Sequence, residues 1–359
     1  SQSRELENCF SSSVCSNGLQ RNWAQEIMGL DLVAEDLKES DAKVKVAIID
    51  DGFDFEGSRQ HLYDTSPAIS HGYQYEGPYV SGGNFGRAIG PIKQMQFDRS
   101  NAGGHGTAVT GLIAGAHGLS AGKNVEVKVF QVFDRYRRST VGLRTRATIQ
   151  RACDEGYKVI NASFGNIGDE SGILEMEEEN KKLLDYLASK GCIVVASAGN
   201  SSFRTKRDHL NRDDAYIRVE ASDLGHGLSS FTSNGELLAP GADVFTLKSE
   251  GSFVSKYSQV QVACEDFPHG NFVNGTSFSA PLVSGVVALI RGELENKGFV
   301  ERLRSQESSL EVAHAKEIAL VNRILQASQI NGEVHAFKAW TLTKQLAEHR
   351  DQNRPENGV

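Results

Sequence analysis

Four polar residues of this sequence have the types and settings that acyl-transfer chemistry needs. Ser277 lies in the segment Asn-Gly-Thr-Ser-Phe-Ser-Ala-Pro, just before the apolar run 282–290, and should therefore occupy the start of a buried helix. A helix start offers backbone N–H groups and a positive dipole end, which favour developing negative charge. Because a serine hydroxyl needs a base to become a useful nucleophile, the segment has chemical meaning only with a histidine and an orienting carboxylate elsewhere.

Both partners are present in glycine-rich surroundings. His105 lies in Gly-Gly-His-Gly-Thr (103–107) at the start of a small-residue helix, and Asp50 ends an apolar strand. Such an acid can accept from one ring N–H and fix the tautomer, while the other ring nitrogen takes the proton of the serine hydroxyl. Asn200 follows the apolar run 194–198, and its amide could donate to the oxyanion of a tetrahedral intermediate.

Alternating strand and helix patterns must position these residues. Short β-branched runs at 44–49, 125–132, 158–162 and 192–197 are typical of parallel strands, with helical patterns at 106–116, 143–155 and 173–190. This alternation predicts an α/β fold with a mostly parallel central sheet and helices on both faces. Ligand sites in such sheets lie at the carboxyl ends of the strands, where Asp50, Asn200 and the loop after Ala162 would fall. Two long stretches, 58–103 and 250–270, interrupt the pattern and are interpreted as loops at the rim of a site.

Asp, His, Asn and Ser in this order, each within its own glycine-rich frame, resemble the subtilisin-like serine peptidases, the subtilase family. The segments 22–37, 159–165, 231–241 and 330–339 also resemble the corresponding parts of that family. The resemblance implies the family's three-layer α/β fold. It divides the chain into an N-terminal extension (1–21), a peptidase domain (22–345) and a polar C-terminal tail (346–359).

The resemblance also implies a role for each residue. Asp50 would orient His105, His105 would act as general base and then as acid, and Ser277 would be the nucleophile. Asn200 and the backbone N–H of Ser277 would donate to the oxyanion. The S1 pocket would be lined by Ser163, Phe164 and Gly165, and an edge strand that pairs with the substrate would comprise Lys128, Val129, Phe130, Gln131, Val132 and Phe133.

The acid motif departs from the family pattern. It has Asp50 followed by Asp51, where the family usually has a small hydroxyl residue in second place, so Asp51 is the alternative orienting group. A second carboxylate would raise one pKa or require a compensating donor. Taken alone, Asp50, Asn200 and Ser277 could be turn or cap residues and His105 an ordinary helix-start residue, but the four together in this order favour catalysis.

No metal or other cofactor is expected to be required. The family's calcium loop has no evident counterpart, because 115–123 contains no carboxylate; calcium near Asp208, Asp213 and Asp214 is an open alternative. His61, His71, His117 and His269 show no metal-ligand spacing. Asp169 and Glu170 either favour a basic residue on the acyl side of the cleaved bond or form an exposed acidic loop.

Composition limits the partners and the compartment. The chain of 359 residues has a formal charge of −8 without a basic stripe, which argues against nucleic acid, and no apolar run approaches the length of a membrane span. It begins without methionine or a signal peptide, which suggests a processed form that is secreted, periplasmic or at the cell surface. Polypeptide substrates are the expected partners, together with the protein's own prosegment or a protein inhibitor.

Five cysteines are present, and their pairing is open. Cys9 and Cys15 are close enough in sequence to close a small loop, either as a disulfide or as free thiols. Cys153 and Cys192 lie in patterns of a buried helix and a buried strand, where free thiols behave as small apolar residues.

The sequence therefore predicts a serine endopeptidase that works through an acyl-enzyme on Ser277. Two alternatives remain: a transacylase or peptide ligase with the same triad, and a non-catalytic binding protein on the same scaffold.

Overall fold

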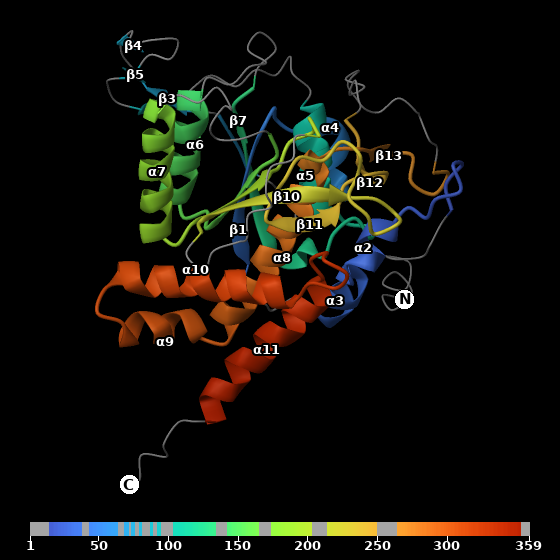
Figure 1. Cartoon of the computed structure of the whole chain (residues 1–359). Helices are drawn as coiled ribbons and strands as arrows, with labels where there is room; N and C mark the ends of the chain where they lie inside the picture. The colour runs from blue at the N-terminus through green and yellow to red at the C-terminus, as the bar shows by residue number, and fades with distance from the viewer. Residues whose placement is uncertain are drawn as a thin grey trace.

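A computed structural model describes most of the chain (Figure 1). The described residues are 14–37, 43–63, 68–71, 73–75, 79–80, 87–88, 92–94, 103–133, 142–164, 174–202, 214–249 and 264–352.

A seven-stranded sheet in these residues forms the centre of the molecule, and all its neighbouring strands are parallel. The spatial order is β11-β10-β9-β8-β1-β7-β2. From β8 to β11 the chain builds the sheet outward from β1, whereas on the other side the later strand β7 lies between β1 and the earlier strand β2. Because β7 and β8 flank β1 on opposite sides, the carboxyl end of β1 is a topological switch point. The strands are β1 (Val44–Asp50), β2 (Ala68–His71), β7 (Val125–Gln131), β8 (Val159–Ala162), β9 (Ile193–Ser197), β10 (Tyr216–Ser222) and β11 (Leu237–Pro240).

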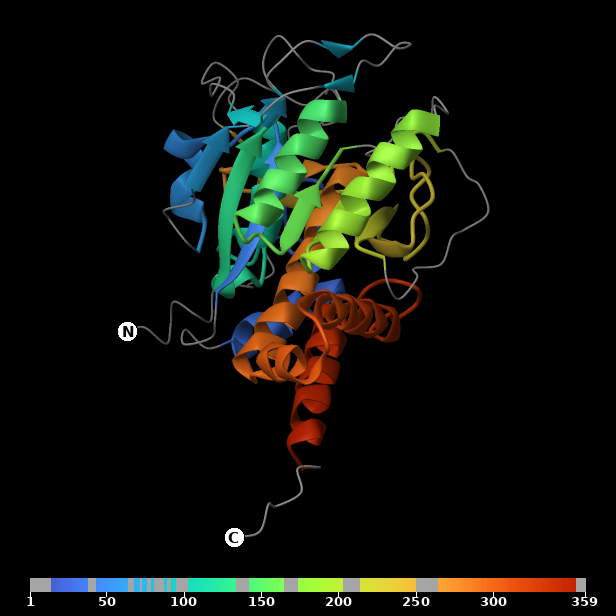
Figure 2. The same ribbon diagram turned by 90° about the vertical axis from the view of Figure 1, so that its left-hand side faces the viewer.

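Helices cover both faces of the sheet, because strands such as β1 are apolar on both sides. Val46 and Ile48 of β1 belong to one buried cluster, and Ala47 and Ile49 to a second cluster on the opposite face. The first cluster is covered by α2 (Trp23–Ile27), α3 (Leu30–Asp36), α5 (Gly104–Ala114), α8 (Thr276–Asn296) and α11 (Ala336–Gln352). The second is covered by α6 (Gly142–Asp154) and α7 (Leu174–Ser189), which lie in front of the sheet in Figure 2.

The remaining helices and strands lie outside the central sheet and the helices that cover it. Two helices, α9 (Phe299–Gln306) and α10 (Leu310–Ala327), lie with α11 at the lower end of the molecule in Figure 1. Three two-stranded antiparallel pairs and three short helices complete the described elements. They are β3 (Tyr73–Tyr75), β4 (Tyr79–Val80), β5 (Arg87–Ala88), β6 (Ile92–Gln94), β12 (Val244–Leu247), β13 (Gly270–Val273), α4 (Phe55–Ser58), η1 (Arg59–His61) and η2 (Gly122–Asn124).

The predicted fold class is confirmed: a mostly parallel sheet lies between two helical layers. The stretch 58–103 differs from its interpretation as a loop, since β2 within it joins the central sheet as an outermost strand. Helix α11 continues to Gln352 and so passes through the expected start of the tail at 346.

Two disulfides answer the open question of cysteine pairing, and the interpretation of Cys153 and Cys192 as free thiols is wrong. Cys15 is bonded to Cys264 rather than to Cys9, and Cys153 is bonded to Cys192, so neither of the latter is a free thiol. The helix α6 and the start of β9 are adjacent in space, which brings the buried sulfurs of the second pair together. Local sequence patterns do not contain this long-range proximity.

Among the described helices, α8 is the one that length and apolar composition would allow to cross a membrane. Inside this protein, 89% of its most apolar window is buried, which is the environment of a core helix.

Candidate active site

Asp50 and His105 form a directly hydrogen-bonded pair. Asp50 is the last residue of β1, and its side chain is 2% exposed. His105, in the first turn of α5, directs Nδ1 at both carboxylate oxygens of Asp50, at 2.8 and 3.0 Å. With the proton on Nδ1, the neutral ring carries its lone pair on Nε2, as a general base requires. The structure therefore places Asp50, and not Asp51, on the ring.

The two chain neighbours of Ser277 contact the histidine and the asparagine. It is the second residue of α8 and is partly buried. The next residue, Phe278, packs its ring 5.4 Å from the ring of His105. The preceding residue, Thr276, bonds to Asn200. The start of α8 thus brings together the candidate nucleophile, base and oxyanion donor.

Thr276 fixes the orientation of Asn200. The Asn200 Oδ1 accepts from the backbone N–H and from the hydroxyl of Thr276, each at 2.9 Å. That hydroxyl also accepts from the N–H of Gly199 at 3.1 Å. The amide nitrogen of Asn200 faces Gly275, where a Cβ would lie 3.3 Å from it and where φ is 145°, a conformation that favours glycine. The role of Thr276 was not predicted, although the Gly-Thr-Ser motif contains it.

Two carboxylates act on the histidine. Burial of the His105 ring lowers its pKa, but the charge and hydrogen bond of Asp50, together with the charge of Asp51, outweigh burial and raise that pKa to about 9. The surroundings therefore stabilise the imidazolium that forms when a serine hydroxyl gives up its proton.

The residues expected to line the S1 pocket differ in their placement. Ser163 is 1% exposed, and its Oγ accepts from the side-chain amide of Asn161 at 2.8 Å, so its hydroxyl is directed into the protein. Phe164 is partly buried, with its ring 5.3 Å from the ring of Phe133. Gly165 lies outside the described residues.

Residues 128–131 are not part of an edge strand, in contrast to the prediction for 128–133. On β7, residues Lys128 to Gln131 pair with β1 on one side and with β2 on the other, so a substrate strand cannot be added there. The following N–H, that of Val132, donates to the carbonyl oxygen of Asp50 at 2.8 Å. The prediction is wrong because β2 arises within a stretch that lacks a strand pattern.

Two carbonyl oxygens of the segment 115–123 after α5 are already hydrogen-bonded within the protein. Its Gly115 and Leu119 carbonyl oxygens accept from Ser120 and Gln25, and Lys123 extends to the Ala34 carbonyl. Calcium prefers several carboxylate and carbonyl oxygens. In the part of the chain that the structure describes, no group of three or more His, Cys, Asp or Glu residues could hold a metal ion. Asp208 and Asp213 lie outside that part.

Curated proteins with similar sequences are serine proteases. Subtilisin DY from Bacillus licheniformis is 28% identical over 197 residues, which are 52% of this chain and 63% of the relative. The epidermin leader peptide-processing serine protease from Staphylococcus epidermidis is 28% identical over 286 residues, which are 68% of this chain and 59% of the relative. The matches span 56–63% of the length of three curated relatives.

Solved structures show the same fold. The nisin leader peptidase from Lactococcus lactis has a TM-score of 0.61 at 19% identity, covering 92% of this chain and 95% of that chain. A lanthipeptide protease has a TM-score of 0.59 at 19% identity, covering 90% and 94%. The sequence profile described as Subtilase family (Peptidase_S8) matches residues 41–325. This match covers most of the chain, and the chain therefore belongs to the subtilase family.

Proposed function

We propose that the chain is a serine endopeptidase that cleaves peptide bonds through an acyl-enzyme on Ser277. The observation that carries the proposal is the hydrogen-bonded Asp50–His105 pair, which lies against the start of α8. The same helix start bears Ser277 and is hydrogen-bonded to Asn200. Membership of the subtilase family supports the same activity.

In the proposed acylation, His105 acts first as a base and then as an acid. Ser277 Oγ attacks the carbonyl carbon while its proton passes to Nε2 of His105, which Asp50 keeps oriented. The oxyanion accepts from the Asn200 amide and the Ser277 backbone N–H. When the C–N bond breaks, His105 gives the proton to the leaving amine. Water, deprotonated by His105, then attacks the ester carbonyl. As the bond from the acyl carbon to Ser277 Oγ breaks, His105 returns the proton to Oγ, and the acid product and free Ser277 are released.

An extended, accessible segment of a polypeptide is the substrate class that we propose. Two curated relatives are leader peptide-processing proteases, for epidermin and for nisin, which supports the removal of a leader segment from a precursor. An extracytoplasmic place of action belongs to the same proposal, because two disulfides are typical of oxidising compartments.

A serine-directed fluorophosphonate tests the nucleophile. We expect it to label Ser277, and both Ser277→Ala and His105→Ala to abolish labelling while the protein stays folded. Ser279→Ala is the matched control, since Ser279 lies on the same helix and its buried Oγ has no hydrogen-bond partner among the described residues. Labelling that persists in Ser277→Ala contradicts the proposal.

A peptide-library digest, followed by mass spectrometry, tests the reaction. Hydrolysed fragments are expected, whereas new peptide bonds between library members would instead indicate the ligase alternative.

A further inference from the structure

The two consecutive carboxylates at the end of β1, those of Asp50 and Asp51, accept hydrogen bonds from different groups. Asp50 directs both carboxylate oxygens at the His105 ring, and one of them also accepts from the backbone N–H of Asp51 at 2.8 Å. Asp51 thus supports the Asp50 carboxylate through its backbone. The Asp51 carboxylate accepts instead from the main chain of α5, at 2.8 Å from the N–H of Gly106 and 3.4 Å from the N–H of His105.

Helix α5 depends on this outside acceptor because it cannot supply its own cap. The residue in the N-cap position, Gly103, has no side chain, and α5 has no side-chain cap hydrogen bond there. A side chain at Gly103 would collide with the turn after Asp51: its Cβ would lie 2.3 Å from the carbonyl carbon of Gly52. The free N–H groups of the first turn are therefore satisfied by a carboxylate 54 or 55 positions earlier in the sequence.

The turn that carries Asp51 is itself fixed. The Asp51 carbonyl oxygen accepts from Nε2 of Gln131 at 3.0 Å, which ties the turn to the end of β7. Gly106 lies so close to the turn that a Cβ there would be 2.1 Å from the Gly52 oxygen. Asp51 is thus held at a set distance from the histidine by contacts from β7 and α5.

We propose that Asp51 is a positioning residue, which fixes the backbone of His105 relative to Asp50 and adds a second negative charge beside the imidazole. The inference rests on the proposed function, because it assigns Asp51 to the base of that reaction. It deepens that function by assigning a task to the acid that stands where the family usually has a hydroxyl.

The charges around the histidine support this role. Burial, reinforced by the charge of Asp50, raises the pKa of Asp51 to about 7, against the opposing effect of His105 and the two backbone N–H bonds. Asp51 is therefore ionised in the alkaline range, where it adds to the effect of Asp50 on the pKa of His105.

Other groups near the histidine carry no comparable charge. The next carboxylate, that of Asp54, accepts from the N–H of Gly57 at 3.1 Å and caps α4. From α8, the uncharged ring of Phe278 packs near the His105 ring. From β7, the neutral amide of Gln131 donates to the backbone of Asp51. Asp50 and Asp51 are thus the charges that raise the pKa of His105 within the described residues.

The test is the pH dependence of fluorophosphonate labelling of Ser277 in the full chain. Removing the Asp51 charge lowers the His105 pKa, so the neutral base forms at lower pH. In Asp51→Asn, which keeps an oxygen acceptor for α5, we expect the acid limb to move to lower pH by about one unit. Asp51→Ala, which also loses the acceptor, should in addition reduce the plateau rate on the order of tenfold.

Control variants distinguish the effect of losing the Asp51 charge from the effect of a loss of folding. Asp54→Asn removes a nearby carboxylate that faces α4, and its profile should overlay that of the wild type. Asp51→Ser, with the family's hydroxyl, is a second charge-free variant and should show the same shift as Asp51→Asn. Thermal melts establish that each variant is folded.

Three outcomes distinguish the hypotheses. A wild-type protein that is not labelled at any pH contradicts the proposed function itself. Labelled wild type together with unshifted acid limbs in the Asn and Ser variants overturns the positioning role alone. If those two variants do not fold, an NMR titration of the His105 ring in folded Asp51→Ala and wild type decides: a lower titration midpoint in Asp51→Ala supports a charge effect, whereas equal midpoints overturn it.

Discussion

At the residue scale, Thr276 couples the proposed nucleophile to the proposed oxyanion donor. Its hydroxyl and N–H hold the carbonyl oxygen of the Asn200 side chain, and Ser277 is the next residue in the chain. A shift of the α8 start would therefore carry both groups together. This arrangement would keep the proposed donor and the proposed nucleophile in a fixed relation, which is the pre-organisation that oxyanion stabilisation requires.

Asn200→Ala is expected to lower kcat by a factor on the order of 10²–10³ with little change in KM, because the lost donor acts on the transition state. That magnitude is known from subtilisin, another member of the family. Steady-state kinetics on a peptide found in the library digest give both constants. An unchanged kcat with a raised KM would instead indicate that Asn200 binds the ground state of the substrate.

At the element scale, the site is made where two helix starts meet the carboxyl end of β1. Local patterns predicted these parts, because an apolar strand ending in Asp50 and the small-residue helices after His105 and Ser277 are visible in consecutive residues. β2 was not predictable, since its four residues lie in a stretch without strand periodicity and pair with β7 only in the folded chain. The direction of the Asp51 side chain likewise depends on α5, which is remote in sequence.

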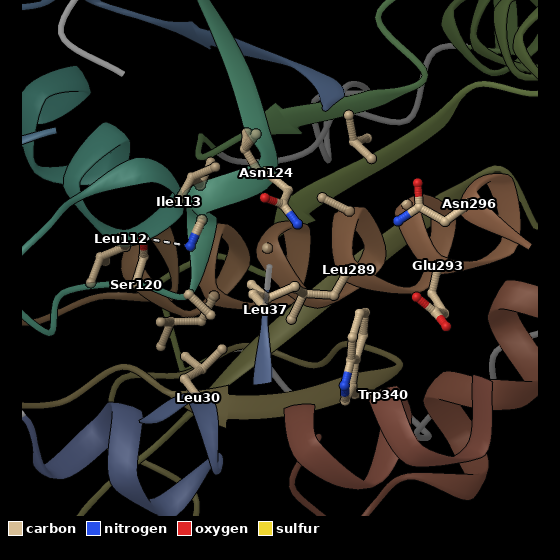
Figure 3. Close-up of a pocket in the computed structure, with 18 residues that line it drawn as sticks. Leu30, Leu37, Leu112, Ile113, Ser120, Asn124, Leu289, Glu293, Asn296 and Trp340 are labelled. Atoms are coloured by element: carbon tan, nitrogen blue, oxygen red, sulfur yellow. Dashed lines mark hydrogen bonds between the residues drawn. The ribbon is translucent and has the colours of Figure 1, made fainter. Parts of the chain in front are cut away.

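A small apolar cavity beneath α8 offers a test of how tightly that helix is packed. The cavity, of about 20 Å³, lies between α8, α3, α5 and α11 and is bounded by side chains such as Leu30, Leu289 and Trp340 (Figure 3). Gly285 of α8 lines it, and a Cβ built at Gly285 meets no heavy atom within 4 Å. A methyl group fits there without displacing a neighbour.

Gly285→Ala should therefore stabilise the protein by about 0.5–1 kcal/mol, because alanine costs less backbone entropy than glycine within a helix. The expected rise in Tm is about 1–2 °C, with an unchanged labelling rate at Ser277. Scanning calorimetry measures the first and the fluorophosphonate assay the second.

The same substitution at Gly106 is the matched contrast. A Cβ there would lie 2.1 Å from the backbone oxygen of Gly52, so α5 would have to move away from the turn that contains Asp51 and Gly52. Gly106→Ala should lower both Tm and labelling. A lower Tm for Gly285→Ala would show that the cavity cannot accept a methyl group.

At the scale of the whole molecule, buried hydrogen bonds and an ion pair join α8 and α10 to the segments that lead into the central sheet. Arg291 of α8 donates to the carbonyl oxygens of Lys158 and Gly191 and lies 3.1 Å from the carboxylate of Glu317 on α10. Both charged side chains are less than 10% exposed. Because a buried charge is costly unless it is paired and hydrogen-bonded, this network specifies how α10 sits against the base of the sheet.

The two disulfides act at the same scale, since each joins parts of the chain that lie apart in sequence. Cys15 and Cys264 are separated by 249 positions, and their bond ties the N-terminal segment to the turn that leads into β13 and then to Ser277. Their pairing depends on which segments meet after folding, which explains why sequence spacing left the partner of Cys15 open.

Removing the longer cross-link should destabilise the protein by about 2–4 kcal/mol, because the unfolded chain regains the freedom that the bond removes. The double variant Cys15→Ser with Cys264→Ser avoids a new unpaired thiol at either site, and its denaturant midpoint should fall. Cys9→Ser is the matched control and should leave that midpoint unchanged, since Cys9 takes part in neither bridge. A non-reducing peptide map provides the independent check: it should contain the 15–264 and 153–192 cross-links, and a 9–15 cross-link would contradict this connectivity and, with it, the expected loss of stability.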